Sequence, residues 1–161
     1  GSATMTEPDL RPRHLRHDRG PVLAKRALML TGFFLSVGTV ATYLTLRDLA
    51  AGIDPGELLH QAPLSEGERS AAFEAARSNF TVYLGGSLFY FGLLVMSRWR
   101  AGEAAMLGFL AWALGRTALR LLSGQLVDPF LLLDLLLLGA LWKGVQSTWP
   151  QFAPKPPAPS D

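Results

Sequence analysis

The sequence predicts an all-α fold: a bundle of four transmembrane helices with a basic N-terminal arm and a disordered, proline-rich C-terminal tail. Of the 161 residues, 49% are hydrophobic and only 17% are charged, whereas about a quarter of the residues of a soluble domain are charged. The charges also gather in a few blocks and leave long charge-free stretches between them. Both observations are typical of a protein that crosses a membrane.

Residues 1–26 form the basic arm. The four residues before Met5 read as a remnant of cloning, so we expect the native sequence to begin at that methionine. Pro12, Gly20 and Pro21 predict that the arm is mobile and is not one continuous helix. Anionic lipid is the expected partner of the arm, because no aromatic residues interleave with its cations as nucleic-acid binding would favour. The expected lipid contacts are Arg16, Arg19, Lys25 and Arg26.

The transmembrane domain is predicted for residues 27–148, with spans at about 27–46, 80–97, 104–122 and 129–145. The first span is twenty residues without a charge, close to the ~20 residues that a helix needs to cross ~30 Å of hydrocarbon. A cleaved signal peptide is the alternative interpretation of this span, but its apolar part is longer than signal peptides use.

A polar outer loop, residues 47–78, separates the first two spans and holds six acidic residues against three basic ones. Asp54-Pro55 is one helix-start signal, and the spacing of Ser65 and Glu68 is that of a capping box. We expect the helix that starts after Ser65 to run directly into the second span.

The last two spans are expected to form a hairpin whose turn centres on Gly124-Gln125. Asp128-Pro129 predicts the start of the fourth span, because Asp is a favoured N-cap and Pro a favoured first helical residue. After the fourth span, residues 149–161 are so rich in proline that we expect them to be extended or disordered.

The distribution of Lys and Arg predicts the orientation. With four spans, ten of these residues lie on the side of the two termini and three lie on the other side. Because retained positive charge marks the cytoplasmic face, both termini are predicted to be cytoplasmic and the acidic loop to be outside. Trp99, Trp142 and Trp149 then fall near the inner boundary of the membrane, where such rings anchor helices.

Charged residues inside the last two spans are the most informative feature. A charge near the bilayer centre costs at least ~2.5–3.5 kcal/mol, so it is expected to face the bundle and to have a partner. Arg116 lies eight residues before the turn and Asp134 nine after it, which places both about 12–14 Å deep and predicts that they meet. The same register sets Arg120 opposite Asp128, and the two arginines share one helix face.

Three interpretations of these charges stay open. The first is a structural staple, in which the Arg116–Asp134 pair fixes the register of the two helices. The second is an outward-opening cationic pocket for an anionic headgroup or carboxylate, favoured because two arginines exceed what one carboxylate neutralises. The third is a proton or ion path through Asp134.

Polar and small residues in the other spans have two interpretations each. Asn79, Tyr83 and Tyr90 share one helix face and either line the same cavity or form an interfacial belt with interhelical hydrogen bonds. Gly32 and Ser36 have a small-xxx-small spacing, which fits internal packing as well as oligomerisation.

No cofactor and no metal site are predicted. The chain has no cysteine, which excludes disulfides, a thiol nucleophile and thiolate-held metal clusters. Its three histidines, His14, His17 and His60, all lie outside the predicted spans. The sequence also lacks a Walker loop, a glycine-rich dinucleotide turn and a Ser-His-Asp set on rigid elements.

Short motifs between Leu28 and Leu141 resemble those of a known group of membrane proteins. The motifs are Arg77 to Gly86 (RSNFTVYLGG), Gly92-Leu93, Gly115-Arg116 and Asp128-Pro129. They are similar to motifs of small four-helix bacterial inner-membrane proteins of unknown function, in the neighbourhood of the DoxX-like proteins. The resemblance implies a multi-pass protein of the bacterial inner membrane with no settled activity. DoxX-like relatives are associated with quinone-linked or redox complexes, for which the cysteine-free, histidine-poor interior of this chain gives no support.

The leading functional hypothesis is a non-enzymatic integral membrane protein, either an accessory subunit or a module that binds a lipid or amphiphile at Arg116 and Arg120. The first alternative is a small carrier for protons or organic anions that uses Asp134. The second is a membrane enzyme on a lipidic substrate, for which Asp134 is the one plausible general base. Membrane lipids are the expected partners, the chain can form a homo-oligomer or join a larger membrane complex, and no nucleic acid is expected.

Overall fold

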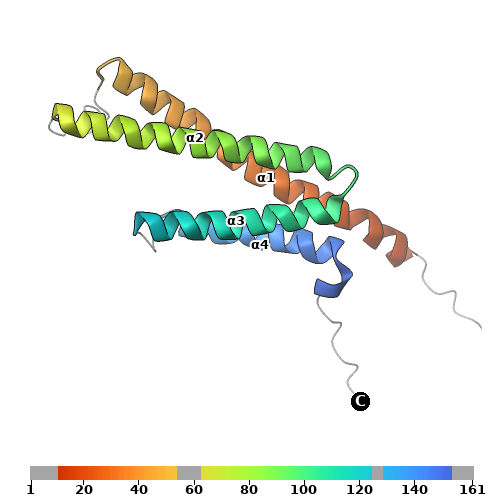
Figure 1. Ribbon diagram of the computed structural model, residues 1–161. Helices are drawn as coiled ribbons and strands as arrows, with labels where there is room; N and C mark the ends of the chain where they lie inside the picture. Colours follow the sequence, from red (N-terminus) through yellow and green to blue (C-terminus); the bar gives the residue numbers. More distant parts are fainter. Residues whose placement is uncertain (1–10, 54–62, 125–128, 154–161) are drawn as a thin grey trace, which may run out of the picture. The chain divides into compact units, whose positions relative to one another are not determined.

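The computed structural model describes residues 11–53, 63–124 and 129–153, and within them every regular element is helical. The elements are α1 (Arg11–Ala50), α2 (Glu66–Met96), α3 (Ala101–Ser123), α4 (Leu131–Thr148) and the short 3-10 helix η2 (Pro150–Phe152) (Figure 1). Each of the four α-helices contains a stretch long and apolar enough to cross a membrane. The predicted all-α fold with four potential spans is confirmed.

Helix α1 is much longer than the predicted first span, and the expected break in the basic arm is wrong. The helix is continuous from Arg11 to Ala50 and has Pro21 inside it. Pro12 is the second residue of the helix, where a backbone N–H has no intrahelical acceptor in any case. Pro21 removes one hydrogen bond, and the helix continues past it through Lys25 and Arg26 into the charge-free stretch that starts at Ala27.

Helix α2 begins with the predicted capping box. The backbone N–H of Ser65 donates to Oε2 of Glu68 at 3.1 Å, and the backbone N–H of Glu68 donates to Oγ of Ser65 at 3.3 Å. The helix then runs without interruption to Met96, so the expected continuation from the loop into the second span is confirmed. Asp54-Pro55, the other helix-start signal, lies outside the described residues.

The boundaries of α3 and α4 differ slightly from the predicted ones. Helix α3 ends at Ser123 with Gly124 as its C-cap, at a left-handed φ of 70° that glycine adopts without strain. Helix α4 begins at Leu131 rather than at Pro129, because Phe130 is the N-cap and its carbonyl accepts the first helical hydrogen bond. Gln125 and Asp128 lie outside the described residues.

The start of the predicted tail is folded, which corrects the expectation of an extended or disordered segment there. Pro150 to Phe152 form η2, and the backbone N–H of Ala153 donates to the carbonyl of Pro150 at 3.2 Å. The ring of Phe152 lies against Trp142, with ring centroids 5.7 Å apart. Aromatic contact therefore holds the turn that proline initiates, while residues 154–161 lie outside the described part of the chain.

The chain divides into two compact units: the α1/α2 unit, Met29–Gly92, and the α3/α4 unit, Gly1–Leu28 with Leu93–Asp161. In the α1/α2 unit the two helices approach closely at small residues. The hydroxyls of Ser36 and Ser87 lie 2.8 Å apart, and a Cβ added at Gly38 would lie 2.5 Å from the ring of Tyr83. A Cβ added at Gly32 would meet Tyr90 at 3.6 Å, so the small-xxx-small pair of this helix serves internal packing here.

In the α3/α4 unit the two named helices lie side by side (Figure 1). Near the start of α3, Nε1 of Trp149 donates to the carbonyl of Gly102 at 2.7 Å. Ala24, Ala105 and Val145 form a buried cluster beside this bond. The side chains that tie this end of the hairpin together are therefore small or aromatic.

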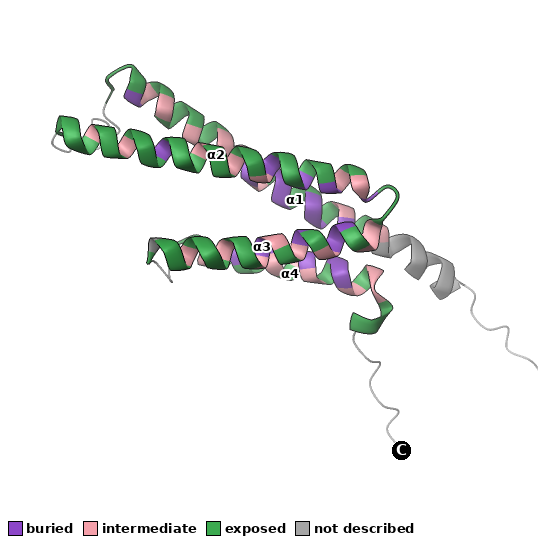
Figure 2. Ribbon diagram, viewed as in Figure 1, coloured by how far each residue is buried: buried purple, intermediate pink, exposed green. Residues whose placement is uncertain are grey.

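Many residues of the four α-helices are exposed (Figure 2), and a large share of them have large apolar side chains. Leu114 and Leu122 on α3 and Leu132 and Leu136 on α4 are each more than 60% exposed. An apolar surface of this extent is unfavourable in water and favourable against acyl chains. The distribution is that of an integral membrane protein.

Candidate functional site

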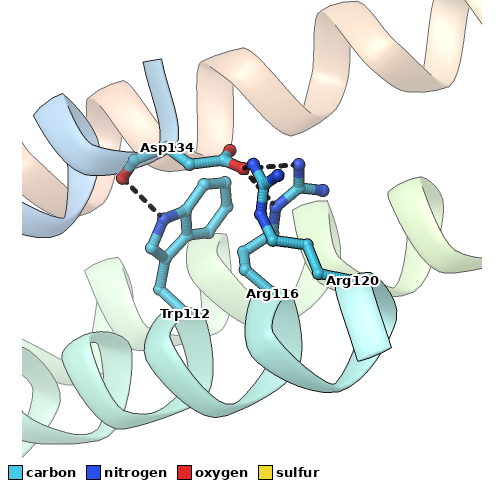
Figure 3. Close-up of polar contacts among 4 residues, drawn as sticks. All are labelled: Trp112, Arg116, Arg120 and Asp134. Atoms are coloured by element: carbon cyan, nitrogen blue, oxygen red, sulfur yellow. Dashed lines mark hydrogen bonds and ion pairs between the residues drawn. The ribbon is translucent and has the colours of Figure 1, made fainter. Parts of the chain in front are cut away.

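The candidate site lies where α3 faces the first turn of α4 (Figure 3). Trp112, Arg116 and Arg120 follow one another at intervals of four residues, which places them on one face of α3. Asp134 is the fourth residue of α4, and its backbone N–H donates to the carbonyl of Phe130 at 2.9 Å. The partial positive charge at a helix N-terminus favours a carboxylate in this first turn.

Both arginines bind the same oxygen of Asp134. Nε and Nη2 of Arg116 donate to Oδ2 at 3.0 and 2.7 Å, and Nη2 of Arg120 donates to the same atom. The dashed lines in Figure 3 show the two guanidinium groups converging on this oxygen. A charge-assisted contact of this kind is about twice as strong as a neutral hydrogen bond, so the carboxylate fastens α4 to one face of α3.

Trp112 contacts both members of the Arg116–Asp134 pair. Its Nε1 donates to the backbone carbonyl of Asp134 at 3.2 Å, and its ring lies under Arg116, with the guanidinium carbon 5.6 Å from the ring centroid. At this distance the ring attracts the cation. Trp112 therefore holds the backbone of α4 and the side chain of Arg116 at the same time.

The three charged side chains are buried to different degrees. The side chain of Asp134 is 7% exposed, that of Arg120 12% and that of Arg116 22%. Oδ1 of Asp134 is buried and has no hydrogen-bond partner among the described residues. Burial of an ionised group is unfavourable unless it is paired, so removal of either cation or anion here leaves an expensive charge behind.

A small cavity of about 180 Å³ opens beside these groups. Its lining combines the charged site with apolar neighbours: Trp112, Ala113, Arg116, Thr117, Arg120, Leu131, Asp134, Leu135 and Leu138. Pockets for whole drug-sized ligands usually measure about 300–1,000 Å³, so this hollow is the size of a polar group rather than of a complete lipid.

The structure confirms the predicted meeting of Arg116 and Asp134. It also brings Arg120 to Asp134, a contact that the hairpin count did not predict. Asp128, the partner expected for Arg120, lies outside the described residues.

The predicted polar residues of the second span lie on α2 in the other unit. Tyr83 packs its ring against Gly38, and Tyr90 is buried with its ring in edge contact with Phe89, centroids 5.5 Å apart. Asn79 is exposed. Tyr83 and Tyr90 both lie beside glycines of α1, at Gly38 and Gly32. Both interpretations of these residues, a shared cavity and an interfacial belt with interhelical hydrogen bonds, stay predictions.

The predicted lipid contacts of the basic arm lie in α1. Lys25 is half-buried and Arg26 is exposed, whereas Arg16 and Arg19 lie where side chains are not described. Contact of these four residues with lipid stays a prediction. In the described part of the chain, no three His, Asp or Glu side chains gather closely enough to hold a metal ion.

Sequence reasoning missed Trp112, which makes two contacts in the site. The signal was present, because a tryptophan one helical turn before an intramembrane arginine is placed to stack on it. For Trp99, Trp142 and Trp149 the sequence predicted only a role at the membrane boundary. Trp142 packs against Phe109, with ring centroids 5.1 Å apart, and Trp149 hydrogen-bonds α3, so both contribute to internal packing.

Comparisons of the chain with family models, with curated proteins and with solved structures find no match. The resemblance to the neighbourhood of the DoxX-like proteins therefore stays a prediction.

Proposed function

We propose that this protein is a non-enzymatic integral membrane protein that holds the anionic headgroup of a lipid or other amphiphile at Arg116 and Arg120. The observation that carries the proposal is the convergence of two guanidinium groups on one carboxylate oxygen beside a small cavity. The protein would act as an accessory or lipid-binding component of a membrane.

The order of exposure supports recognition of an anion. Arg116 is three times as exposed as Asp134, so a group that enters the cavity meets the guanidinium before it meets the carboxylate. Among the described residues, none accepts a hydrogen bond from Nη1 of Arg116, whose Nε and Nη2 are already bound to Asp134. This edge is free to donate to a phosphate or carboxylate oxygen.

The charges of the site support the same conclusion. Among the described side chains that line the cavity, two carry guanidinium groups and one carries a carboxylate, a set that favours an anion. Binding an anion in a partly buried position then replaces water with charge-assisted hydrogen bonds.

The size of the cavity indicates that only the headgroup of the ligand enters it and that the acyl chains stay outside. The cavity accommodates a headgroup only, while the exposed Leu135 in its lining offers an apolar surface to acyl chains. An amphiphile can contact both the charged cavity and the apolar surface beside it, whereas a purely polar anion can contact only the cavity.

Native mass spectrometry of the protein extracted with its own lipids tests the proposal, because it reports bound molecules and stoichiometry together. Arg116→Lys keeps a positive charge next to Asp134 but removes the planar fork, so we expect retention of the anionic lipid bound at this site to fall about tenfold. Arg100→Lys is the matched control, because Arg100 forms an exposed pair with Glu103 at 3.2 Å outside the cavity. Equal lipid retention by both variants and the wild type would refute the proposal.

A further inference from the structure

We infer that a second site, a groove between α1 and α2, binds the headgroup of an anionic phospholipid through Arg47 and Arg77. The groove has a volume of about 580 Å³ and lies wholly within the α1/α2 unit. It shares no residue with the Arg116 site, so the inference does not depend on the proposed function.

Three contacts show that α1 and α2 are antiparallel in this unit. Gly32 lies beside Phe91, Ser36 bonds Ser87, and Tyr43 contacts Phe80 with ring centroids 6.4 Å apart. Residue numbers rise along α1 as their partners' numbers fall along α2. The charge-free stretches of the two helices therefore end at the same end of the pair.

The two arginines mark that end. Arg47 directly follows the charge-free stretch of α1, and Arg77 is the last charge before the charge-free stretch of α2. Tyr43 and Phe80 lie about one helical turn further into the apolar stretches and line the same groove. The groove thus has two guanidinium groups at one end and aromatic rings further into the apolar stretches. A lipid has the same order of groups, from its charged headgroup to its acyl chains.

The charge balance of the groove favours an anion. Arg47 contacts the neighbouring Asp48 at 3.4 Å, but both side chains are exposed, and a pair of this kind contributes little. Among the described residues, no acidic side chain forms an ion pair with Arg77, and none lines the groove. Cations placed at the edge of an apolar span attract anionic headgroups.

The aromatic residues favour a lipid over a free anion. Tyr43, Phe73 and Phe80 all line the groove, and a water-soluble phosphate would leave their rings uncovered. The volume also lies in the range of about 300–1,000 Å³ that holds a sizeable ligand, in contrast to the smaller cavity at Arg116. A phospholipid covers the rings with its glycerol and upper acyl carbons while its phosphate meets the arginines.

Fluorine NMR can test this site directly, because the chain has three tyrosines and Tyr43 is the one in the groove. The full chain, labelled with 3-fluorotyrosine in a neutral detergent, is titrated with dioctanoyl phosphatidylglycerol. We expect the Tyr43 signal to shift saturably while the signals of Tyr83 and Tyr90 stay in place. Phosphatidylcholine and glycerol phosphate are expected to leave the Tyr43 signal unchanged over the same range.

Variants that remove a positive charge test whether Arg47 and Arg77 bind the phospholipid headgroup. We expect Arg47→Gln and Arg77→Gln each to weaken the Tyr43 titration about fivefold. The matched control is the double variant Arg98→Gln/Arg100→Gln, which changes two exposed arginines beyond the other end of α2. We expect its titration to stay within twofold of the wild type.

Four results would overturn the inference. These are an unresponsive Tyr43 signal, an unchanged titration in the variant that lacks both Arg47 and Arg77, an equal shift with glycerol phosphate, and equal weakening in the control. Arg116→Lys separates the two proposals, because it is expected to lower lipid retention in mass spectrometry without changing the Tyr43 titration.

Discussion

Arg116 reaches across the hairpin to Asp134 and binds one oxygen of that carboxylate twice, at 3.0 and 2.7 Å, while the other oxygen is buried without a hydrogen bond from the described residues. The pair joins the middle of α3 to the start of α4. Its strength rests on a single atom, Oδ2, which also receives Arg120.

Replacement of Asp134 with Asn should strongly destabilise the hairpin. The substitution leaves two guanidinium groups close together without their shared anion, and loss of one partner of a buried pair costs about 3–5 kcal/mol. Chemical unfolding in detergent micelles measures the change. Glu103→Gln, which breaks an exposed pair with Arg100, should lower the free energy of unfolding by less than about 1 kcal/mol. Similar small losses in both variants would contradict the role of Asp134.

Trp112→Phe separates the two contacts of the tryptophan. Phenylalanine keeps an aromatic ring under Arg116 but loses the N–H that donates to the carbonyl of Asp134, so we expect a loss of about 1 kcal/mol. Trp112→Leu also removes the aromatic ring and should cost about 0.5–2 kcal/mol more. The same unfolding measurement applies, and equal stability of the two variants would show that the ring does not stabilise the guanidinium.

Gly38→Ala should destabilise the α1/α2 unit, because the new Cβ would lie 2.5 Å from the ring of Tyr83. Overpacking of this kind costs about 1–3 kcal/mol. Gly85→Ala is the control, since no atom lies within 4 Å of the added methyl group and alanine favours a helix over glycine by up to about 1 kcal/mol. Thermal unfolding should therefore shift in opposite directions for the two variants, and a parallel shift would argue against the close approach at Gly38.

Thiol labelling tests the predicted orientation without background, because the chain contains no cysteine. We expect a membrane-impermeant maleimide to label Ser70→Cys in intact cells, since Ser70 is exposed and lies in the polar loop, residues 47–78, that is predicted to be outside. Ser160→Cys, near the C-terminus, should react only after the membrane is permeabilised. The reverse pattern would invert the predicted orientation.

Much of the α3/α4 hairpin could be predicted because helix geometry converts residue counts into depth. Eight residues on one side of a turn and nine on the other were enough to pair Arg116 with Asp134. The capping box at Ser65 was equally predictable, because its two hydrogen bonds depend on neighbours in the sequence.

Other features could not be predicted, because they depend on side-chain contacts that cannot be obtained by counting residues along the sequence. The reach of Arg120 to Asp134 depends on the side-chain conformation of a long, flexible arginine. Helix α1 continues past Pro21 although proline in a helix interior costs about 3 kcal/mol, a cost that the rest of this 40-residue helix outweighs. Likewise, the folded turn after Trp149 depends on Phe152 meeting distant aromatic rings.

The hydroxyl contact between Ser36 and Ser87 carries no formal charge, and neither does the contact of Gly38 with Tyr83. At these residues the contact between α1 and α2 is uncharged, whereas the contact between α3 and α4 at Asp134 is electrostatic. Loss of the charge of Asp134 would therefore weaken the contact between α3 and α4 and leave the Ser36–Ser87 contact unchanged. The chain thus joins one helix pair through uncharged contacts and the other through a buried ion pair.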